Sequence, residues 1–430
     1  MNLAVDSRAL PRALGAMPAD VRRAADLWWL HPTCIVLLAL VPVYLGVLAY
    51  DFSRVVQNVY VPSLLYGFGL AMIVSIAVGA QWALSNRQLG SARIPPRISQ
   101  TTMLILLLPA LAAYAIWFGP LLAQPQLLLE IASGARQEVR DAISTIPGVT
   151  TFTQFGVAYV IAYAIKRGAG LQRVRWYETA GLLLLFALAV FRGYAWAERL
   201  ALIELLVCFA IARLAYLPIT SPLLWRASNL LPAVGPFVLY GVFTASEYFR
   251  SWEYYANQYD SVWAFTLDRL IAYYATAVNN GIGTLTDLTG WPVYNGAYAL
   301  EWAYLMPGLG KVLQSVFGSV RDADKLWLEV YARPEFNSPT AYFRVLADLG
   351  YLGAILYFIA VGYVIGRAYA GFRRGHVFGL LAYPLFVLFL IESLRYSYFA
   401  ETRVVPLIVG LVLIAVDMRR SLQQPSAGVS

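Results

Sequence analysis

The residues of this chain that are best suited to chemistry on an anion are arginines beside apolar segments. Arg192 and Arg199 lie in one short connection, "FRGYAWAER", and Arg395 and Arg403 lie in another, "SLRYSYFAETR". Arg344 enters a third apolar segment, "VLADLGYLGAILYF". A guanidinium stays charged and offers a fork of N–H donors that matches phosphate oxygens. If the fold brings these side chains together, they can bind a diphosphate.

Arginine near a membrane also has a structural explanation. Its side chain can extend along apolar surface to reach water, or it can pair with a nearby carboxylate. Glu198, Glu392 and Glu401 lie in the same connections as the arginines. Any single arginine fits either explanation. The whole set, interleaved with aromatic residues such as Tyr194 and Tyr396, favours a site, although aromatic residues also gather at membrane interfaces without a ligand.

The candidate general bases on the outer side are the carboxylates Asp348, Glu198, Glu247 and Glu253, of which we assign Asp348 and Glu198 to catalysis. Asp348 stands in "ADLGYLGA" at the start of an apolar helix, where partial desolvation would raise its pKa toward a useful range. A helix-entry residue beside a glycine bend explains it equally well. The two histidines, His31 and His376, are both expected on the other side of the membrane, so no histidine is expected in the site.

A D-x-D pair in "RDADK", Asp322 and Asp324, has the spacing with which many sugar transferases hold a divalent ion. It lacks a neighbouring acidic ligand and is flanked by Arg321 and Lys325. We interpret it as a solvated acidic face and expect neither a metal nor a cofactor.

The elements that position these residues are expected to be membrane helices. Hydrophobic residues make up 60% of the 430 residues, charged residues 13%, and the mean hydropathy is +0.62. This composition excludes an ordinary soluble enzyme, and backbone groups in lipid must be satisfied within helices. About ten apolar runs are long enough to span the hydrocarbon core. They are 33–50, 61–84, 101–123, 149–165, 176–191, 200–216, 230–246, 346–370, 377–391 and 404–416.

The basic residues predict the orientation. They concentrate in alternate connections, as the positive-inside rule expects, and this distribution accounts for the net charge of +8 without nucleic acid. Both termini are then cytoplasmic, with tails at 1–32 and 418–430. The arginine-bearing connections and a large loop at 248–343 lie on the outer face of the membrane.

The large loop is expected to contain short amphipathic helices. In "SVWAFTLDRLIAYYATAVNN" the apolar positions recur at helical spacing, turn-rich residues follow, and "DADKLWLEVYARP" is a second helical candidate. Residues 1–430 are therefore predicted to form one all-α polytopic membrane domain with one large insertion on the outer face.

The order of these pieces resembles the oligosaccharide repeat-unit polymerases, the Wzy-type O-antigen and exopolysaccharide polymerases. The matching pieces are the Arg192 to Arg199 turn, a long outer loop with "YYATAVNNG", the segment "NSPTAYFRVLADLGYLGAILYFIAVGYVIG", and the turn that carries Arg395 and Arg403. They cover roughly residues 180–416.

The resemblance implies a GT-C-like fold and transfer of a growing glycan from undecaprenyl diphosphate to the non-reducing end of a carrier-linked repeat unit. The transfer would take place on the periplasmic face of a bacterial inner membrane, so the loop at 248–343 would lie in the periplasm. The five arginines would stabilise the leaving diphosphate, with Asp348 or Glu198 as base and inversion at the anomeric carbon. We assign glycan contacts to Tyr274, Asn280 and Tyr396. The implied partners are the carrier-linked oligosaccharide, the bilayer and a chain-length regulator.

Two alternatives stay open. A ligase would join finished glycan to an acceptor other than a carrier-linked repeat, and a flippase would move lipid-linked sugar without making a bond. Transporters place polar groups near the membrane midplane. Here Glu204 is the one acidic residue expected well inside a span, and the other polar residues gather at the outer face. This pattern favours an enzyme.

Overall fold

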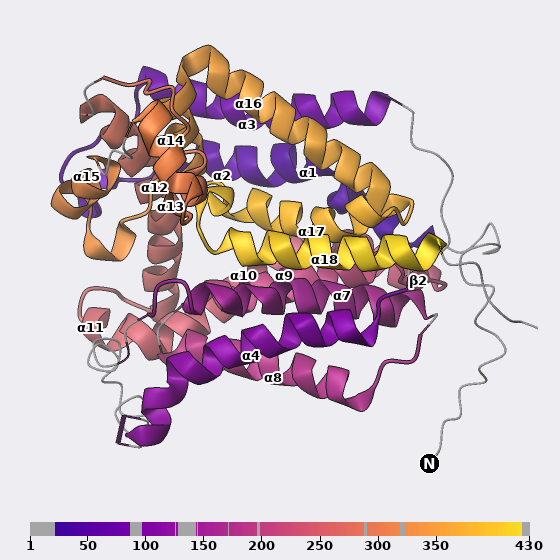
Figure 1. The fold of residues 1–430 in the computed structure, drawn as a ribbon. Coiled ribbons are helices and arrows are strands. Elements are labelled where there is room, and N and C mark those ends of the chain that lie inside the picture. Colours follow the sequence, from indigo (N-terminus) through magenta and orange to yellow (C-terminus); the bar gives the residue numbers. More distant parts are fainter. Residues whose placement is uncertain are drawn as a thin grey trace, which may run out of the picture.

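The computed structural model describes residues 22–86, 97–124, 126–127, 143, 145–170, 172–195, 198–287, 290–318 and 323–423. Within these ranges the protein is mostly helical, and helical residues lie at each of the ten predicted span positions. The long helices run lengthwise through one bundle (Figure 1). The all-α prediction is confirmed.

Six described helices are long and apolar enough to cross a membrane, by length and composition. The first is composite: α1 (Pro32–Ile35), a π-helical turn (Val36–Leu40), α2 (Val41–Gly46) and a 3₁₀ turn (Val47–Ala49). The other five are α3 (Leu64–Ser85), α4 (Gln100–Ala123), α8 (Trp176–Ala195), α10 (Pro222–Glu247) and α16 (Ala341–Arg373).

Four further helices occupy the remaining predicted positions and are shorter or more polar. They are α7 (Phe155–Ala169), α9 (Leu200–Leu214), α17 (Val377–Glu392) and α18 (Val404–Gln423). A 3₁₀ segment (Thr150–Gln154) leads into α7.

Helices α3 and α16 pack against each other, and α16 crosses α3 at the top of Figure 1. Small residues let their backbones approach closely. A Cβ added to Gly79 of α3 would collide with the carbonyl of Ile359, and one added to Gly362 of α16 would collide with the carbonyl of Ile76. Membrane helices commonly pack in this way, because close van der Waals contact replaces the hydrophobic driving force that lipid does not supply.

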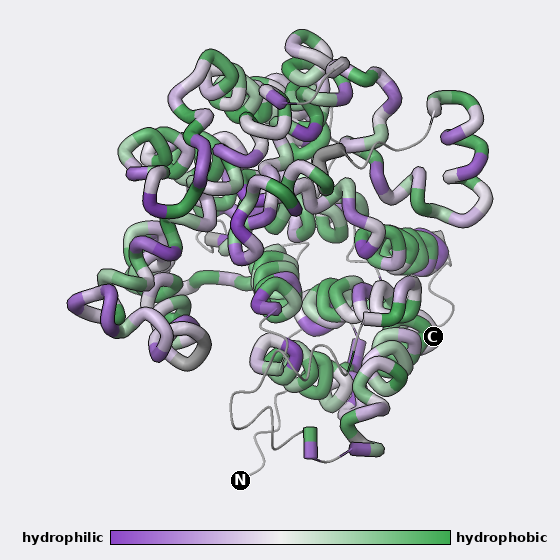
Figure 2. The backbone as a smooth tube through the Cα atoms, turned by 90° about the vertical axis from the view of Figure 1, so that its left-hand side faces the viewer, coloured by the Kyte–Doolittle hydropathy of each residue, from purple (hydrophilic) through white to green (hydrophobic). Residues whose placement is uncertain are grey.

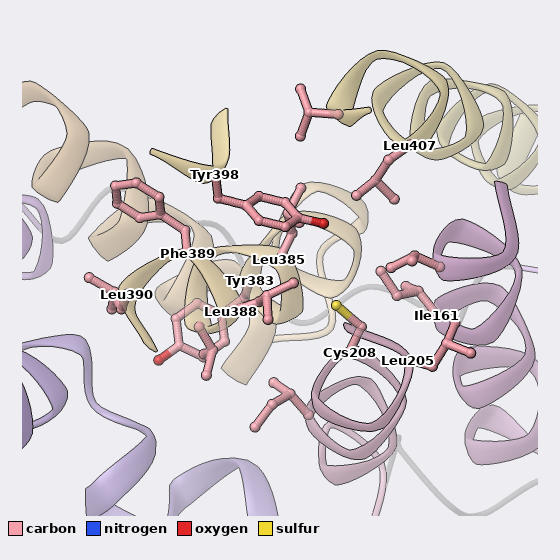
Figure 3. Close-up of a cluster of buried hydrophobic side chains, with 14 of the residues drawn as sticks. Ile161, Leu205, Cys208, Tyr383, Leu385, Leu388, Phe389, Leu390, Tyr398 and Leu407 are labelled. Carbon is pink, nitrogen blue, oxygen red and sulfur yellow. The ribbon is translucent and has the colours of Figure 1, made fainter. Parts of the chain in front are cut away.

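A buried apolar cluster joins α7, α9, α17 and α18, the helices next to the arginine-bearing connections. Ile161 of α7, Cys208 of α9, Leu388 of α17 and Leu407 of α18 meet in it, and Tyr398 lies on the same cluster (Figure 3). Tyr398 belongs to a 3₁₀ turn (Tyr398–Ala400) in the connection between α17 and α18. The core therefore anchors the connection that carries Arg395 and Arg403.

One end of the bundle, called here the loop-bearing end, carries the helices of the large loop, of which all but α12 are short (Figure 1). They are α11 (Glu253–Tyr255), α12 (Val262–Asp287), α13 (Glu301–Leu305), α14 (Leu309–Phe317) and α15 (Ala323–Tyr331). Figure 2, which looks onto this end, shows hydrophilic and hydrophobic stretches alternating along these segments.

Both helices predicted in the loop are present, but α12 continues further than expected. The residues "GIGTLTD", predicted as part of a turn-rich stretch, form its last two turns and are mostly buried. Two asparagines explain the extension. Asn279 accepts from the backbone N–H of Tyr60 (2.8 Å) and donates to the carbonyl of Asn58 (3.1 Å), and Asn280 donates to the carbonyl of Phe336 (2.7 Å).

The opposite end holds the ends of α16 and α18 and the predicted tail residues from 22 onward. Strand β1 (Arg22–Arg23) pairs antiparallel with β2 (Pro218–Ile219), and Ala24, Ala25 and Leu27 are buried. Asp26 accepts from the guanidinium of Arg373 at 2.8 Å. This part of the segment predicted as a tail therefore packs on the bundle.

Candidate functional site

An open cleft of about 620 Å³ lies at the loop-bearing end and collects four of the five predicted arginines. Arg192 comes from the last turn of α8, Arg344 from the first turn of α16, and Arg395 and Arg403 from the connection between α17 and α18. We call it the arginine cleft. Its lining residues are Thr145, Thr150, Thr151, Thr153, Gln154, Arg192, Leu200, Glu301, Leu328, Asn337, Ser338, Pro339, Arg344, Arg395, Tyr396, Glu401, Thr402 and Arg403.

A second cavity, the lateral pocket, adjoins the cleft and has a volume of about 320 Å³. It shares Arg192, Leu200, Arg395 and Arg403 with the cleft, and it adds the fifth predicted arginine, Arg199. Its remaining lining residues are Glu198, Ala201, Ile203, Phe243, Leu270, Tyr273, Tyr274 and Glu392. The two cavities therefore meet at three shared guanidinium groups.

Each of the five arginines is paired with a glutamate. The pairs are Arg192 with Glu198 (2.5 Å), Arg199 with Glu247, Arg344 with Glu301 (3.0 Å), Arg395 with Glu392 (3.8 Å) and Arg403 with Glu204 (3.4 Å). The structural explanation for arginine thus holds at every position. The site offers directional N–H donors at fixed places rather than a large net positive charge.

The pairs differ in how firmly the carboxylate is held. The side chains of Glu204 and Glu247 are 1% and 0% exposed, whereas that of Glu198 is 36% exposed. A buried carboxylate cannot leave its arginine without a large desolvation penalty, but an exposed one can turn into water. Arg403 and Arg199 are therefore anchored donors, and Arg192 is the arginine whose partner an incoming anion can replace.

Buried neighbours fix the anchored arginines further. Glu247 also forms an ion pair with Arg269 of α12, with 2.8 Å between Oε2 and Nε, which ties α10 to α12 behind Arg199. Glu204 accepts from the side-chain amide of Gln154 at 2.7 Å. The guanidinium of Arg403 donates to the Tyr396 hydroxyl and lies 5.4 Å from the centroid of the Tyr398 ring. These contacts restrict the rotamers of the two side chains.

Glu198, one of the two predicted bases, lines the lateral pocket beside Arg192. The Nε of Arg192 donates to its Oε2 at 2.6 Å, and the Arg192 guanidinium lies 4.7 Å from the centroid of the Trp117 ring. Glu198 therefore pairs with an arginine that lines both cavities, and its carboxylate can reach either cavity when this ion pair opens.

Asp348, the other predicted base, does not line either cavity. Its side chain is fully buried, and its Oδ2 accepts the backbone N–H groups of Tyr298 (2.9 Å) and Ala299 (2.6 Å). The predicted glycine bend follows at Gly350, where φ is +66° inside α16. This position corrects the prediction that Asp348 is the general base. A carboxylate that accepts from two loop amides away from the cleft cannot reach an acceptor hydroxyl.

A pair of substitutions separates the two roles of Asp348. Asp348→Ala should lower the free energy of unfolding by about 1–3 kcal/mol, because two buried amide donors lose their acceptor. Asp348→Asn keeps an oxygen at that place and should retain most of the stability and most of the activity. Thermal unfolding and turnover of both variants check this. Loss of activity in a folded Asp348→Asn protein would restore the base assignment.

The predicted glycan contacts divide in the same way. Tyr396 lines the arginine cleft, and Tyr274 lines the lateral pocket. Burial raises the pKa of the Tyr274 phenol to about 12, so this side chain remains a neutral hydrogen-bonding group. Asn280 lines neither cavity. Its amide is buried against the carbonyls of Phe336 and Ser338 (3.4 Å), so it positions the segment with Ser338 at the cleft wall. This corrects its assignment as a glycan contact.

Sequence reasoning missed the polar wall of the cleft. Thr150, Thr151, Thr153 and Gln154 approach from the 3₁₀ entry to α7, and Asn337 and Ser338 from the segment before α16. Their hydroxyl and amide groups suit the hydroxyl groups of a sugar. The signal was the density of polar residues in "TTFTQ", directly before an apolar run. Asp322 of the D-x-D pair and the Asp324 side chain lie outside the described residues.

No protein-family model, no curated protein and no solved structure matches this chain.

Proposed function

We propose that this protein is a glycan polymerase that acts on lipid-linked repeat units at the loop-bearing end of a membrane bundle. The observation that carries the proposal is the convergence of Arg192, Arg344, Arg395 and Arg403, from separate segments, on one open cleft. Glycosyl transfer from a lipid diphosphate needs fixed donors where negative charge develops, and the anchored arginines supply them.

The cleft also has groups for the other part of the substrate. Threonine, serine, asparagine and glutamine side chains line the cleft together with the arginines, and Tyr396 lines it too. The lateral pocket is more aromatic, with Phe243, Tyr273 and Tyr274, and it borders α10, whose apolar residues are largely exposed. We assign the glycan to the cleft and the lipid-proximal diphosphate to the junction with the lateral pocket.

The proposed reaction is a single displacement. The oxygen of an acceptor hydroxyl bonds to the anomeric carbon of the donor glycan while the bond from that carbon to the diphosphate oxygen breaks. The electron pair leaves with undecaprenyl diphosphate, held by Arg192, Arg395 and Arg403, and the proton of the acceptor passes to the carboxylate of Glu198. A displacement of this kind inverts the anomeric centre.

The ion pair between Arg192 and Glu198 gives this reaction an order. A diphosphate that binds the fork of Arg192 displaces the half-exposed Glu198, and the freed carboxylate becomes available as base. Base and leaving-group donor are therefore both engaged when the donor substrate is in place.

The placement of buried charge favours an enzyme over a transporter. Among the described residues, Lys166, Glu178, Glu247 and Glu392 are buried charged side chains near helix ends. Glu204, Arg269 and Asp348 are also buried, and they lie in the first third of α9, α12 and α16 respectively. None of these seven side chains lies in the central third of its helix, whereas transporters place substrate and coupling-ion groups near the membrane midplane. The proposed topology has ten spans, cytoplasmic termini and a periplasmic loop-bearing end.

Product length tests the proposal. Purified protein in liposomes, supplied with carrier-linked repeat units alone, should produce a ladder of lengthening lipid-linked glycans. Elongation that requires a different acceptor would identify a ligase, and movement of the substrate across the bilayer without bond formation would identify a transporter.

A further inference from the structure

A cavity at the opposite end of the bundle plays no part in the proposed reaction. It has a volume of about 790 Å³ and lies between the last turn of α7 and the first turn of α8. We call it the basic pocket, lined by Gln100, Lys166, Gln172, Arg173, Val174, Arg175, Trp176, Tyr177 and Thr179. The described lining includes three cations and no carboxylate.

The acid nearest to these cations is already engaged. Glu178 is buried, its Oε1 accepts from the Lys166 ammonium at 2.6 Å, and its Oε2 accepts the backbone N–H of Arg175 at 2.9 Å. The side chains of Arg173 and Arg175 are exposed, and within the described ranges neither has an ion-pair partner. In this respect they differ from all five arginines of the functional site, and two guanidinium groups stay available for an external anion.

An apolar track leads away from the basic pocket. Trp176 at the pocket is 81% exposed, and Leu183 and Val190, each seven residues further along α8, are 63% and 54% exposed. Residues seven apart lie on one face of a helix, and Ala180, Ala187 and Tyr194 are exposed on the same stripe. Helix α8 is itself long and apolar enough to cross a membrane. Exposed tryptophan at the end of such a helix is typical of the membrane interface.

We propose that the basic pocket binds the phosphate of an anionic phospholipid, whose acyl chains lie along the exposed stripe of α8. Basic pockets between membrane helices bind such headgroups through Arg and Lys contacts to phosphate oxygens. A free phosphate would use the same cations but would leave the adjoining stripe uncovered. The inference does not depend on the polymerase assignment, because none of these residues lines the arginine cleft or the lateral pocket.

Native mass spectrometry of the full-length protein, titrated with dioleoyl phosphatidylglycerol, tests the proposal. The double variant Arg173→Gln/Arg175→Gln should weaken the tightest lipid site about 30-fold, since each basic contact contributes a factor of about five. The matched control Arg419→Gln/Arg420→Gln removes the same charge from exposed positions of α18 outside the pocket and should keep that site. Melting temperatures of both variants show that each is folded.

Two further ligands separate the sources of phosphate. Dioleoyl phosphatidylcholine should bind at least tenfold more weakly than phosphatidylglycerol, and glycerol 1-phosphate should not compete at the concentrations that saturate the lipid site. Equal binding of the two lipids, or equal losses in the two double variants, would overturn the site. Competition by glycerol 1-phosphate at matched concentration would show that the pocket takes a soluble phosphate instead.

Discussion

Arg192→Gln is expected to lower the rate of glycan elongation by about 10²–10³, because loss of one fixed donor to a developing oxyanion typically has that effect. Arg192 lines both cavities, and it is the shared arginine that α8 contributes at their junction, whereas Arg395 and Arg403 come from the connection between α17 and α18. The fold should survive, since the partner Glu198 is 36% exposed and can be solvated when its arginine is removed. Elongation is measured from the product ladder, and stability from thermal unfolding.

The matched control for this variant is Arg419→Gln, which removes one exposed cation from the far end of α18. It should leave elongation within a factor of about two, in line with the small effects of most surface substitutions. If Arg192→Gln elongates glycan as well as this control does, Arg192 serves only its ion pair with Glu198.

The second large effect is expected at Arg403, where stability and activity should separate. Arg403→Gln leaves the buried carboxylate of Glu204 without its cation, although Gln154 still donates to it at 2.7 Å. Breaking a buried pair in this way costs about 3–5 kcal/mol. We therefore expect a markedly lower melting temperature together with loss of elongation.

Adding Glu204→Gln to Arg403→Gln should restore most of the melting temperature, because no uncompensated charge remains buried. Elongation should stay low, since the donor to the diphosphate is still missing. Recovery of elongation along with stability in the double variant would show that Arg403 acts through folding alone.

The helices and the convergence of the arginines follow from local signals in the sequence. Hydropathy locates helices such as α8 and α17 to within a few residues, and alternation of short connections brings Arg192 and Arg403 to one end of the bundle. These features depend on residues that are close together along the chain, so they can be predicted from the sequence.

The roles of Asp348 and Asn280 could not be predicted because they depend on distant backbone. The amides that Asp348 holds belong to Tyr298 and Ala299, about 50 residues earlier, and the carbonyls that Asn280 holds lie more than 50 residues later. A loop amide has no signature in the sequence, so a buried carboxylate that binds it resembles a catalytic one.

The glutamate partners were foreseen only in part. Glu198 and Glu392 stand beside their arginines in the sequence, but Arg199 pairs with Glu247 from the end of α10, Arg344 with Glu301 from α13, and Arg403 with Glu204 from α9. The carboxylates of Glu247 and Glu204 are the most buried of the five, and their burial decides which arginines are anchored. Helix packing determines these long-range ion pairs, so the spacing of the residues along the chain does not reveal them.

The proposed glycosyl transfer requires that the junction of the arginine cleft and the lateral pocket binds a diphosphate. The most direct measurement is the affinity of the purified protein for farnesyl diphosphate, a short prenyl analogue of the carrier, compared with farnesyl monophosphate. We predict that the protein prefers the diphosphate, and that Arg192→Gln weakens diphosphate binding at least tenfold, as loss of a charge-assisted hydrogen bond implies. If the unsubstituted protein binds the two analogues equally tightly, and Arg192→Gln binds them as tightly as the unsubstituted protein does, the proposed diphosphate site is contradicted.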